Sequence, residues 1–511
     1  MRTDHATHDV VVVGAGSAGC ALAHRLTQDG HRDVLLLEAG GPDDDESIRT
    51  PARFPELFRT EVDWDYYTLP QDELNDRRLY HPRGKTLGGS SSLNAMIYVR
   101  GHRTDYDHWA ELGNDGWGYD EMLTQFERSE HFQGGSGEYH GEGGPLNVAE
   151  PVDPHPLSEA MVEAMAEVGI DRNSDFNAGR QAGSGFYHLT QREGKRCSGA
   201  AAFIQPALDR PNLSVETEAQ VTGVTFDGDR ATGVTYERDG TEHAVEASSE
   251  VVLSAGAINS PQLLMLSGIG PADHLSERGI DVRADLPGVG RNLQDHLKVG
   301  VVYERTRGPE TPAPSSNVVE TGGFVRTDED LPAPDLQFHN APVYLLEHGL
   351  SAPDDGRQFF SILPTQIRPE STGEVRLASA DPHEAPVIDP NYLDAEGDVD
   401  PLVEGVELAR EIARSAPLDD FRGTEVEPGP DVTADEEIEA FVREHATTVY
   451  HPVGTCKMGD DDMAVVDDEL RVHGVEGLRV VDASIMPRIV GGNTNAPTIA
   501  IAEHAADSIA G

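Results

Sequence analysis

The residues with the clearest chemistry stand near the start of the chain, where Gly14, Gly16 and Gly19 follow a run of valines. Glycines at this spacing allow a tight turn, close approach to a pyrophosphate and close packing of a following helix, whose first amide N–H groups bind phosphate. Glu38 stands 19 residues after Gly19, where its carboxylate can accept from ribose hydroxyls and would repel a 2′-phosphate. The pattern predicts a site for FAD or NAD rather than NADP, and it does not separate the first two.

A second group of reactive residue types lies near the C-terminus. Tyr450 and His451 precede a Pro-Val-Gly-Thr stretch, Asp482 and Ala483 follow an apolar run, and Asn495 lies in Gly-Gly-Asn-Thr-Asn-Ala-Pro-Thr. The pKa of imidazole lies near neutrality, so a histidine suits proton transfer. However, this is one histidine among 21. Taken alone, these residues indicate a constrained backbone and no particular reaction.

The elements that must position these residues follow from the hydrophobic pattern. Val10–Val13 and Val34–Leu37 are predicted to be buried parallel strands with a helix between them. Residues 213–245 alternate as strands do, with glycines as turn residues, which predicts a β-meander. A further buried strand is predicted at residues 251–256.

A helix is predicted after that last strand, with Pro261 in its first turn and Gly268 at its end. Small and hydroxylated residues fill the segment 84–101. Side chains of this size let a planar ring lie against the backbone. Strand, loop and helix therefore recur at a second edge of the predicted nucleotide site.

A chain of 511 residues exceeds one ordinary core, so we expect two lobes. Residues 1–297 are expected to bind the dinucleotide, with residues 151–199 contributing partly to the substrate lobe. Prolines interrupt the extended segments of residues 298–439, which we assign to the substrate-binding domain.

The charge of the chain is strongly negative. It has 91 acidic and 39 basic residues, a formal net charge of −52, and four lysines: Lys85, Lys195, Lys298 and Lys457. Self-repulsion of this size is tolerable where concentrated salt shortens the Debye length to a few ångströms. We expect a halophilic source, with an acidic protein of an ordinary cell as the alternative. Either interpretation disfavours nucleic acid and anionic membranes as partners.

Cysteine spacing and apolar runs set the remaining expectations. The three cysteines, Cys20, Cys197 and Cys456, have no paired spacing, so no metal site and no disulfide framework is predicted. The first nine residues lack the apolar core of a signal peptide, and no apolar run reaches membrane-spanning length. We expect a cytoplasmic protein without a transmembrane segment.

Four motifs, in the same order, resemble those of the glucose–methanol–choline (GMC) flavin oxidoreductases, in the style of choline dehydrogenases and related alcohol dehydrogenases. They are the fingerprint 14–38, the segments 84–101 and 256–270, and the C-terminal His and Asn blocks, which together span nearly the whole chain. The resemblance implies an α/β (α+β) fold, with a Rossmann-like FAD-binding domain and a smaller substrate-binding domain built on an antiparallel sheet. It also implies that residues 440–511 return to the FAD-binding domain and carry His451 and Asn495.

The resemblance implies FAD contacts from every one of these segments. The residues are Gly14, Gly16, Ser17, Ala18, Gly19, Glu38, Ala39, Gly88, Gly89, Asn94, Ala95, Val221, Ala255, Gly256, Asp482 and Ala483. Relatives with covalently attached flavin carry a histidine where this chain has Leu93. We therefore expect FAD to be held non-covalently.

The resemblance also places His451 and Asn495 against the isoalloxazine ring. His451 is implied as the general base that takes the hydroxyl proton, and Asn495 as the amide donor to the developing alkoxide. The implied reaction oxidises a primary alcohol, choline among the candidates, to the aldehyde. Electrons would pass to a quinone, another acceptor or oxygen.

Trp64, His339 and Tyr450 are the candidates for the substrate pocket. A quaternary ammonium such as choline requires an aromatic cage with a carboxylate. Trp64 and Tyr450 suit the walls, and Glu304 suits the carboxylate, although an ordinary surface-strand glutamate is the simpler interpretation. His339 would either contact substrate or make a structural hydrogen bond.

Three other functions are alternatives to this reaction. The first is a hydrogen-peroxide-forming alcohol or choline oxidase, and the second is a non-redox lyase of the same fold that uses the same histidine. The third, an NAD-dependent enzyme, is disfavoured by the GMC motifs. Flavin reduction by alcohols, with and without an artificial acceptor, separates the first two from the dehydrogenase.

Overall fold

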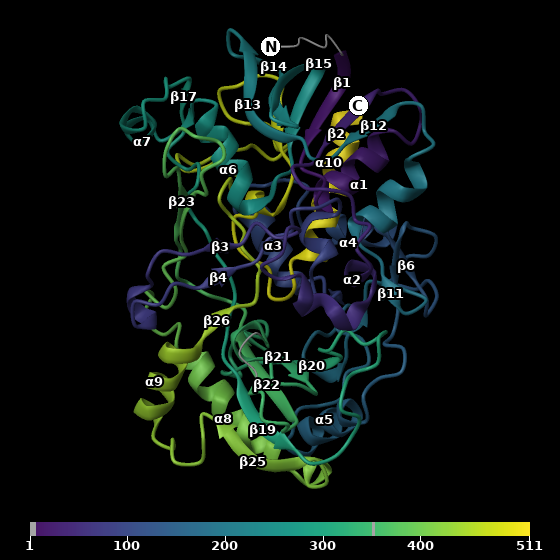
Figure 1. Cartoon of the computed structure of the whole chain (residues 1–511), viewed down its shortest axis with the longest axis vertical. Helices are drawn as coiled ribbons and strands as arrows, with labels where there is room; N and C mark the ends of the chain where they lie inside the picture. The colour runs from purple at the N-terminus through teal and green to yellow at the C-terminus, as the bar shows by residue number, and fades with distance from the viewer. Residues whose placement is uncertain (1–6, 350–352, 511) are drawn as a thin grey trace.

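The computed structural model describes residues 7–349 and 353–510 and arranges them around two large sheets (Figure 1). The sheets lie toward opposite ends of the long axis. One contains the N-terminal strand, and the other lies at the end that carries α8 (Asp400–Arg414) and α9 (Asp435–His445).

The first sheet has seven strands and is centred on β1 (Thr7–Val13). β1 pairs in parallel with β2 (Val34–Leu37) on one side and with β15 (Thr241–Leu253) on the other. β12 (Leu213–Glu216) pairs with β2, and β27 (Leu478–Val480) pairs with the end of β15. Val10–Val13 and β2 are buried throughout, because layers cover both faces of a parallel sheet.

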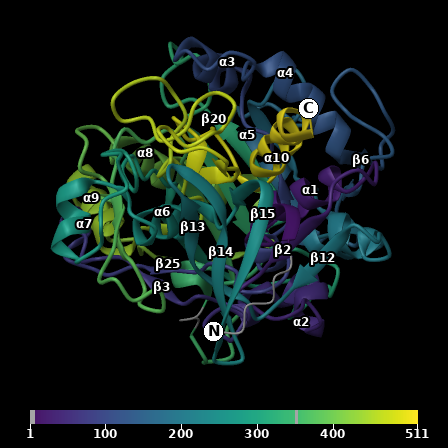
Figure 2. The same cartoon turned by 90° about the horizontal axis from the view of Figure 1, so that it is seen from above.

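The helix between the two predicted strands is α1 (Ser17–Leu26), which packs against β1 and β2. The C-terminal helix α10 (Asn495–Ala510) packs against α1, and the two are close together in both views (Figures 1 and 2). The C-terminal segment therefore returns to the first sheet, and its first helical residue lies beside the glycine turn.

The meander predicted over residues 213–245 is confirmed from residue 220 onward, but residues 213–216 form β12, which pairs in parallel with β2 and is not part of it. β13 (Gln220–Asp227), β14 (Arg230–Arg238) and β15 are consecutive antiparallel neighbours. The separate strand predicted at residues 251–256 is wrong, because those residues continue β15 as far as Leu253. At Glu246 the strand leaves β14 and continues beside β1, so that one 13-residue element serves both pairings.

The predicted position of Pro261 is also wrong. Helix α6 (Gly256–Leu266) begins directly after β15, which places Pro261 inside the helix. The carbonyl that proline cannot bond is that of Ala257, and it accepts from the Thr455 hydroxyl at 2.6 Å. Gly268 follows the helix end with φ +83°, as the sequence predicted.

The second sheet is antiparallel and has eight strands. Its order is β25 (Arg422–Glu427), β19 (Val301–Arg305), β22 (Phe359–Gln366), β21 (Leu336–Ala341), β20 (Thr321–Val325) and β8 (Gly183–Phe186). The short β18 (Leu297–Lys298) pairs with β22 and with β26 (Thr447–Thr448). Three distant parts of the chain therefore share this sheet.

Helices cover the second sheet and complete its core. α8 packs on β22, α5 (Pro156–Glu167) packs on β8 and β20, and α9 packs on α8. Their apolar residues form one buried cluster with strand residues such as Phe338 and Phe360. No helix among the described residues is long and apolar enough to cross a bilayer.

Candidate active site

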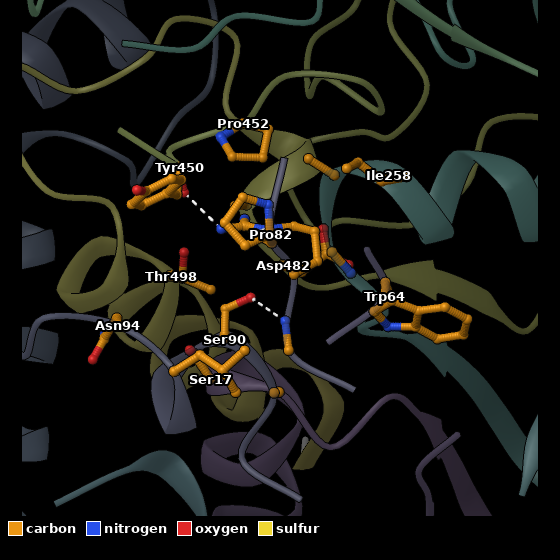
Figure 3. Close-up of a pocket in the computed structure, with 18 of the residues that line it drawn as sticks. Ser17, Trp64, Pro82, Ser90, Asn94, Ile258, Tyr450, Pro452, Asp482 and Thr498 are labelled. Atoms are coloured by element: carbon orange, nitrogen blue, oxygen red, sulfur yellow. Dashed lines mark hydrogen bonds between the residues drawn. The ribbon is translucent and has the colours of Figure 1, made fainter. Parts of the chain in front are cut away.

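One cavity is lined by residues of both sheets (Figure 3). Val13, Leu37 and Ser254 line it at the carboxyl ends of β1, β2 and β15. The second sheet contributes Lys298 and His339. Ligands of open α/β sheets bind at this edge. The cavity thus has a nucleotide end at the first sheet and a second end at the antiparallel sheet.

Glu38 lies at the nucleotide end, buried and held by the backbone. One carboxylate oxygen accepts from the Ala15 N–H at 2.9 Å and the other from the Gly40 N–H at 2.8 Å. Burial is the largest effect on this carboxyl and raises its pKa to about 7. Each oxygen retains a lone pair, so the group can still accept from a hydroxyl in the cavity.

Fourteen of the sixteen predicted cofactor residues line this cavity, and Gly19 and Gly88 lie behind it. A Cβ on Gly19 would stand 1.9 Å from the Gly14 carbonyl oxygen, so Gly19 allows α1 to pack against the turn. The Gly88 N–H donates to the Ala15 carbonyl at 2.8 Å and ties the segment 84–101 to the same turn.

The nucleotide end fits a dinucleotide. Gly16 and Gly256 stand in the cavity wall, yet a Cβ added to either would meet no protein atom within 4 Å. At these two glycines the backbone itself borders the cavity and no side chain fills the space beside it. Glu38 lies at the end of the neighbouring strand β2. Leu93 also lines the cavity, at the position where covalent attachment would require a histidine.

His451 lies at the other end of the cavity, and a backbone hydrogen bond holds it in place. The backbone N–H of His451 donates to Asp295 Oδ1 at 2.7 Å. Asp295 is buried, and it also accepts from the Tyr392 hydroxyl at 2.5 Å and the Thr448 hydroxyl at 2.6 Å. Together with the contact to His81 Nε2 at 3.2 Å, these bonds hold the pKa of the Asp295 carboxyl well below its usual range despite burial.

The imidazole of His451 is held between His296 and Asn493. Its Nδ1 lies 2.9 Å from His296 Nδ1, and its Nε2 lies 3.3 Å from Asn493 Nδ2. Gln337 Nε2 donates to Asn493 Oδ1 at 3.1 Å, which turns the Asn493 NH₂ toward His451. The network thus assigns a lone pair to His451 Nε2 and the N–H to Nδ1.

Burial keeps these two imidazoles neutral. It lowers the pKa of His451 well below the usual value, with the neighbouring His296 as a second cause. It lowers the pKa of His296 to about 4. A neutral imidazole with an available lone pair can accept a proton from a bound hydroxyl.

The structure places Asn495 in the cavity wall, where its side chain bonds to Ser17 and not to His451. Asn495 is the first residue of α10, and its Oδ1 accepts from the Ser17 hydroxyl at 2.7 Å. The amide that contacts His451 Nε2 is that of Asn493, two residues before Asn495, in the loop that precedes the helix. The role predicted for Asn495 at the reaction centre stays a prediction, and the geometry favours Asn493.

The three pocket candidates line the cavity in different surroundings. Figure 3 shows Trp64 and Tyr450 on opposite sides of Pro82 and Asp482. Trp64 stacks on Tyr66, with ring centroids 5.7 Å apart, and Tyr450 belongs to another apolar cluster. No single cage contains both rings. Glu304 is outside the cavity wall and pairs with Arg357 at 2.8 Å.

The backbone of Tyr450, the residue directly before His451, is strained. Its φ is +73°, a left-handed conformation that bulky side chains rarely adopt. The Arg83 guanidinium donates to its carbonyl at 2.8 Å, and its hydroxyl lies 2.5 Å from His348 Nδ1. These contacts hold the strained turn that points His451 toward the cavity.

His339 makes a structural hydrogen bond and also lines the cavity. Its Nδ1 lies 3.0 Å from the Thr365 hydroxyl, and burial lowers its pKa to about 3. Its Nε2 is buried without a hydrogen-bond partner among the described residues. The structural hydrogen bond is therefore present, and substrate contact by His339 stays a prediction.

Sequence reasoning missed Asn493, His296 and Lys298. Asn493 stands in the Gly-Gly-Asn-Thr-Asn block, two residues before Asn495. The sequence signal for the other two is the adjacent polar pair Asp295 and His296, which leads into an apolar strand. Among the described residues, no group of three or more His, Cys, Asp or Glu is placed to hold a metal ion.

Comparisons with known proteins agree on one family. The chain matches the GMC oxidoreductase family over residues 8–298 and 369–502. It is 44% identical to the alcohol dehydrogenase [acceptor] of Pseudomonas putida, with 98% of this chain and 95% of that protein covered. It is 45% identical to the mitochondrial choline dehydrogenase of Mus musculus, with 98% and 89% covered.

A solved structure shares the whole fold. The pyridoxine 4-oxidase of Mesorbium loti is 36% identical, with a TM-score of 0.93 and 98% of each chain covered. The chain is thus similar in sequence to two dehydrogenases and in structure to an oxidase.

Proposed function

This chain belongs to the GMC oxidoreductase family and is an FAD-dependent oxidoreductase of alcohols, and we propose that it oxidises a primary alcohol to the aldehyde with His451 as the general base. The observation that carries the proposal is the lone pair on His451 Nε2, which borders the cavity beside an amide donor. FAD, when bound, supplies the acceptor for the hydride that leaves the substrate carbon.

The nucleotide end holds the cofactor through backbone and one carboxylate. Gly16 leaves the space beside the turn free for the pyrophosphate, whereas Gly14 lets the turn pass close to the Ser254 backbone. N–H groups at the start of α1 would bind the phosphates, and Glu38 would accept from the ribose hydroxyls. Asn94, Ala95, Val221, Ala255, Asp482 and Ala483 border the rest of the cavity. With Leu93 in the wall, the cofactor is held without a covalent bond.

His451 performs the proton transfer. Its Nε2 accepts the hydroxyl proton while its Nδ1–H remains directed at His296. The imidazolium that forms is stabilised by the Asp295 carboxylate, which is bound to the His451 backbone N–H. Because burial lowers the pKa of His451, the base is neutral at the start of each turnover.

Asn493 positions the oxygen that loses the proton. Its NH₂ group is turned toward His451 by Gln337, so an alcohol oxygen near Nε2 lies within reach of both groups. An amide N–H stabilises the negative charge that develops on that oxygen. Base and donor therefore act on one atom of the substrate.

The electron acceptor is a quinone, another acceptor or oxygen, and turnover with and without an artificial acceptor distinguishes the dehydrogenase from the peroxide-forming oxidase. We also infer a cytoplasmic location in a salt-accumulating cell, without nucleic-acid partners. The net charge of −52 supports this inference.

The test is the anaerobic flavin spectrum in molar KCl, scanned with choline and a panel of primary alcohols. Bleaching of the flavin band with an alcohol is the expected result. A spectrum that stays oxidised with every alcohol contradicts the proposal and favours lyase chemistry, which cleavage of a cyanohydrin would establish.

His451→Ala is expected to keep bound FAD and to lower the rate of flavin reduction by about 10² to 10⁴, the usual cost of losing a general base. The wild-type rate should hold as the pH falls below 6.5, because the lowered pKa keeps His451 unprotonated there. The control His31→Ala changes an exposed histidine. Equal rates for both variants would place the base elsewhere.

A further inference from the structure

Lys298 is a buried lysine in a chain that has four lysines. Its residue is 4% exposed, and it lines the reaction end of the cavity together with His339 and Tyr450. Each of the other three lysines has a partner or is exposed to solvent. Lys457 pairs with Asp461, Lys85 lies 4.5 Å from the Trp64 ring centroid, and Lys195 is exposed.

The Lys298 ammonium has no anionic partner. Among the residues that the structure describes, it makes no ion pair and no hydrogen bond, and its one polar contact is the Tyr450 ring, 5.7 Å from Nζ to the centroid. Burial lowers its pKa to about 8, so the group is mainly cationic at neutral pH. An unpaired buried charge is costly and is normally retained only where something pairs with it.

The reaction end of the cavity has positive character. The charge of Lys298 helps to lower the pKa values of His339 and His348, after burial. Arg83 adds a second cation to the wall.

Carboxylates are absent from that end within the described part of the chain. The acidic residues of the cavity wall are Glu38 and Asp482, and both hold backbone amides at the nucleotide end. Asp295 is not part of the cavity wall, and its Oδ2 already contacts His81, Tyr392 and Thr448. No described residue neutralises Lys298, so the opposite charge is left for a ligand.

Lys298 and His296 both lie near His339. Both of their charges help, after burial, to lower the pKa of His339, which lines the cavity. His296 contacts the catalytic His451. One small molecule can therefore reach both the base and the ammonium.

We propose that Lys298 binds a carboxylate on the substrate, so that the enzyme oxidises short primary alcohols that carry a carboxylate and discriminates against the quaternary ammonium of choline. The inference rests on the proposed function, since it names the substrate class of the same site. A carboxylate would gain a charge-assisted hydrogen bond from the ammonium, whereas a trimethylammonium group would face repulsion and find no carboxylate.

The experiment compares Lys298→Met, which removes the charge, with Lys298→Arg, which keeps it, and with the control Lys195→Met at an exposed lysine. Holoenzyme at pH 7 and constant ionic strength is titrated with butyrate, a carboxylate without a hydroxyl, and binding is followed through the flavin absorbance. Anaerobic flavin reduction is then measured with γ-hydroxybutyrate, n-butanol and choline.

We expect butyrate to bind the wild type and Lys195→Met equally, and Lys298→Met about 10- to 100-fold more weakly. The ratio of kcat/KM for γ-hydroxybutyrate to that for n-butanol should fall by a similar factor in Lys298→Met and recover in Lys298→Arg. Equal butyrate affinity in Lys298→Met and wild type overturns the inference, as does a wild-type preference for choline. Reduction by n-butanol shows in either case that the proposed function holds, whereas no reduction by any alcohol overturns that function and this inference with it.

Discussion

At the scale of single residues, the reaction centre depends on which side chains stay uncharged. Two imidazoles whose Nδ1 atoms lie 2.9 Å apart would repel if both were protonated, and burial prevents this by lowering both pKa values. Asp295 supplies the compensating charge one hydrogen bond away. The centre can therefore accept exactly one proton without a large change in its surroundings.

The two asparagines of the C-terminal block provide a matched pair of variants. Asn493→Ala removes the donor on His451 Nε2 and is expected to lower the rate of flavin reduction by about 10² to 10³, the usual cost of one donor to a developing oxyanion. Asn495→Ala removes the acceptor of the Ser17 hydroxyl and is expected to affect FAD retention more than this rate. Stopped-flow reduction and flavin content measure the two effects, and the opposite ranking would return the donor role to Asn495.

This pair also shows where the sequence is insufficient at the residue scale. The motif identifies His451 and the asparagine block, because their residue types and order are visible in the chain. The choice between two asparagines depends on where α10 begins, since its first residue turns toward Ser17 and the preceding loop faces the base. Helix starts are set by tertiary contacts as well as by local sequence.

At the scale of elements, the glycine turn between β1 and α1 lends itself to a direct test. Gly16 has φ −77°, and a Cβ there would contact no protein atom, so Gly16→Ala should fold normally. The added methyl group would enter the cavity, and overpacking of this kind costs about 1–3 kcal/mol, or about a 5- to 150-fold loss of FAD affinity. Fluorescence titration of the apoprotein measures the loss, with Gly137→Ala, at an open site away from the cavity, as the control. Unchanged affinity in Gly16→Ala would place the pyrophosphate elsewhere.

Among the elements, those marked by local apolar patterns could be predicted from the sequence, and those that depend on distant contacts could not. β1, α1 and β2 were predicted from apolar runs and glycine spacing, which are local signals. The length of β15 and the interior position of Pro261 were not, because each depends on a distant partner. β15 continues because β1 offers a second edge, and Pro261 is tolerated because the Thr455 hydroxyl bonds the carbonyl that it leaves free. The antiparallel sheet, assembled from three parts of the chain, was expected from the family resemblance and not from its short strands.

At the scale of the whole molecule, charge is the dominant feature. With 91 acidic and 39 basic residues, at least 52 acidic side chains remain even if every lysine and arginine forms one ion pair. Many of the ion pairs that exist are on the surface and contribute little each. The folded chain therefore carries a repulsion that its own pairs do not remove, while no described carboxylate lines the reaction end of the cavity around Lys298.

Salt should therefore stabilise this protein. The Debye length falls from about 30 Å at 0.01 M to about 3 Å at 1 M ionic strength, so repulsion between surface carboxylates is largely screened in molar KCl. We expect the Tm of the holoenzyme to rise by several degrees between dilute buffer and molar KCl, with saturating FAD present throughout so that cofactor loss does not contribute. Sucrose at equal osmolality is the control, since it favours compact states without screening charge. A Tm that is flat in KCl, or that rises equally in sucrose, would show that repulsion does not limit stability, and the acidic surface would then need an explanation other than adaptation to salt.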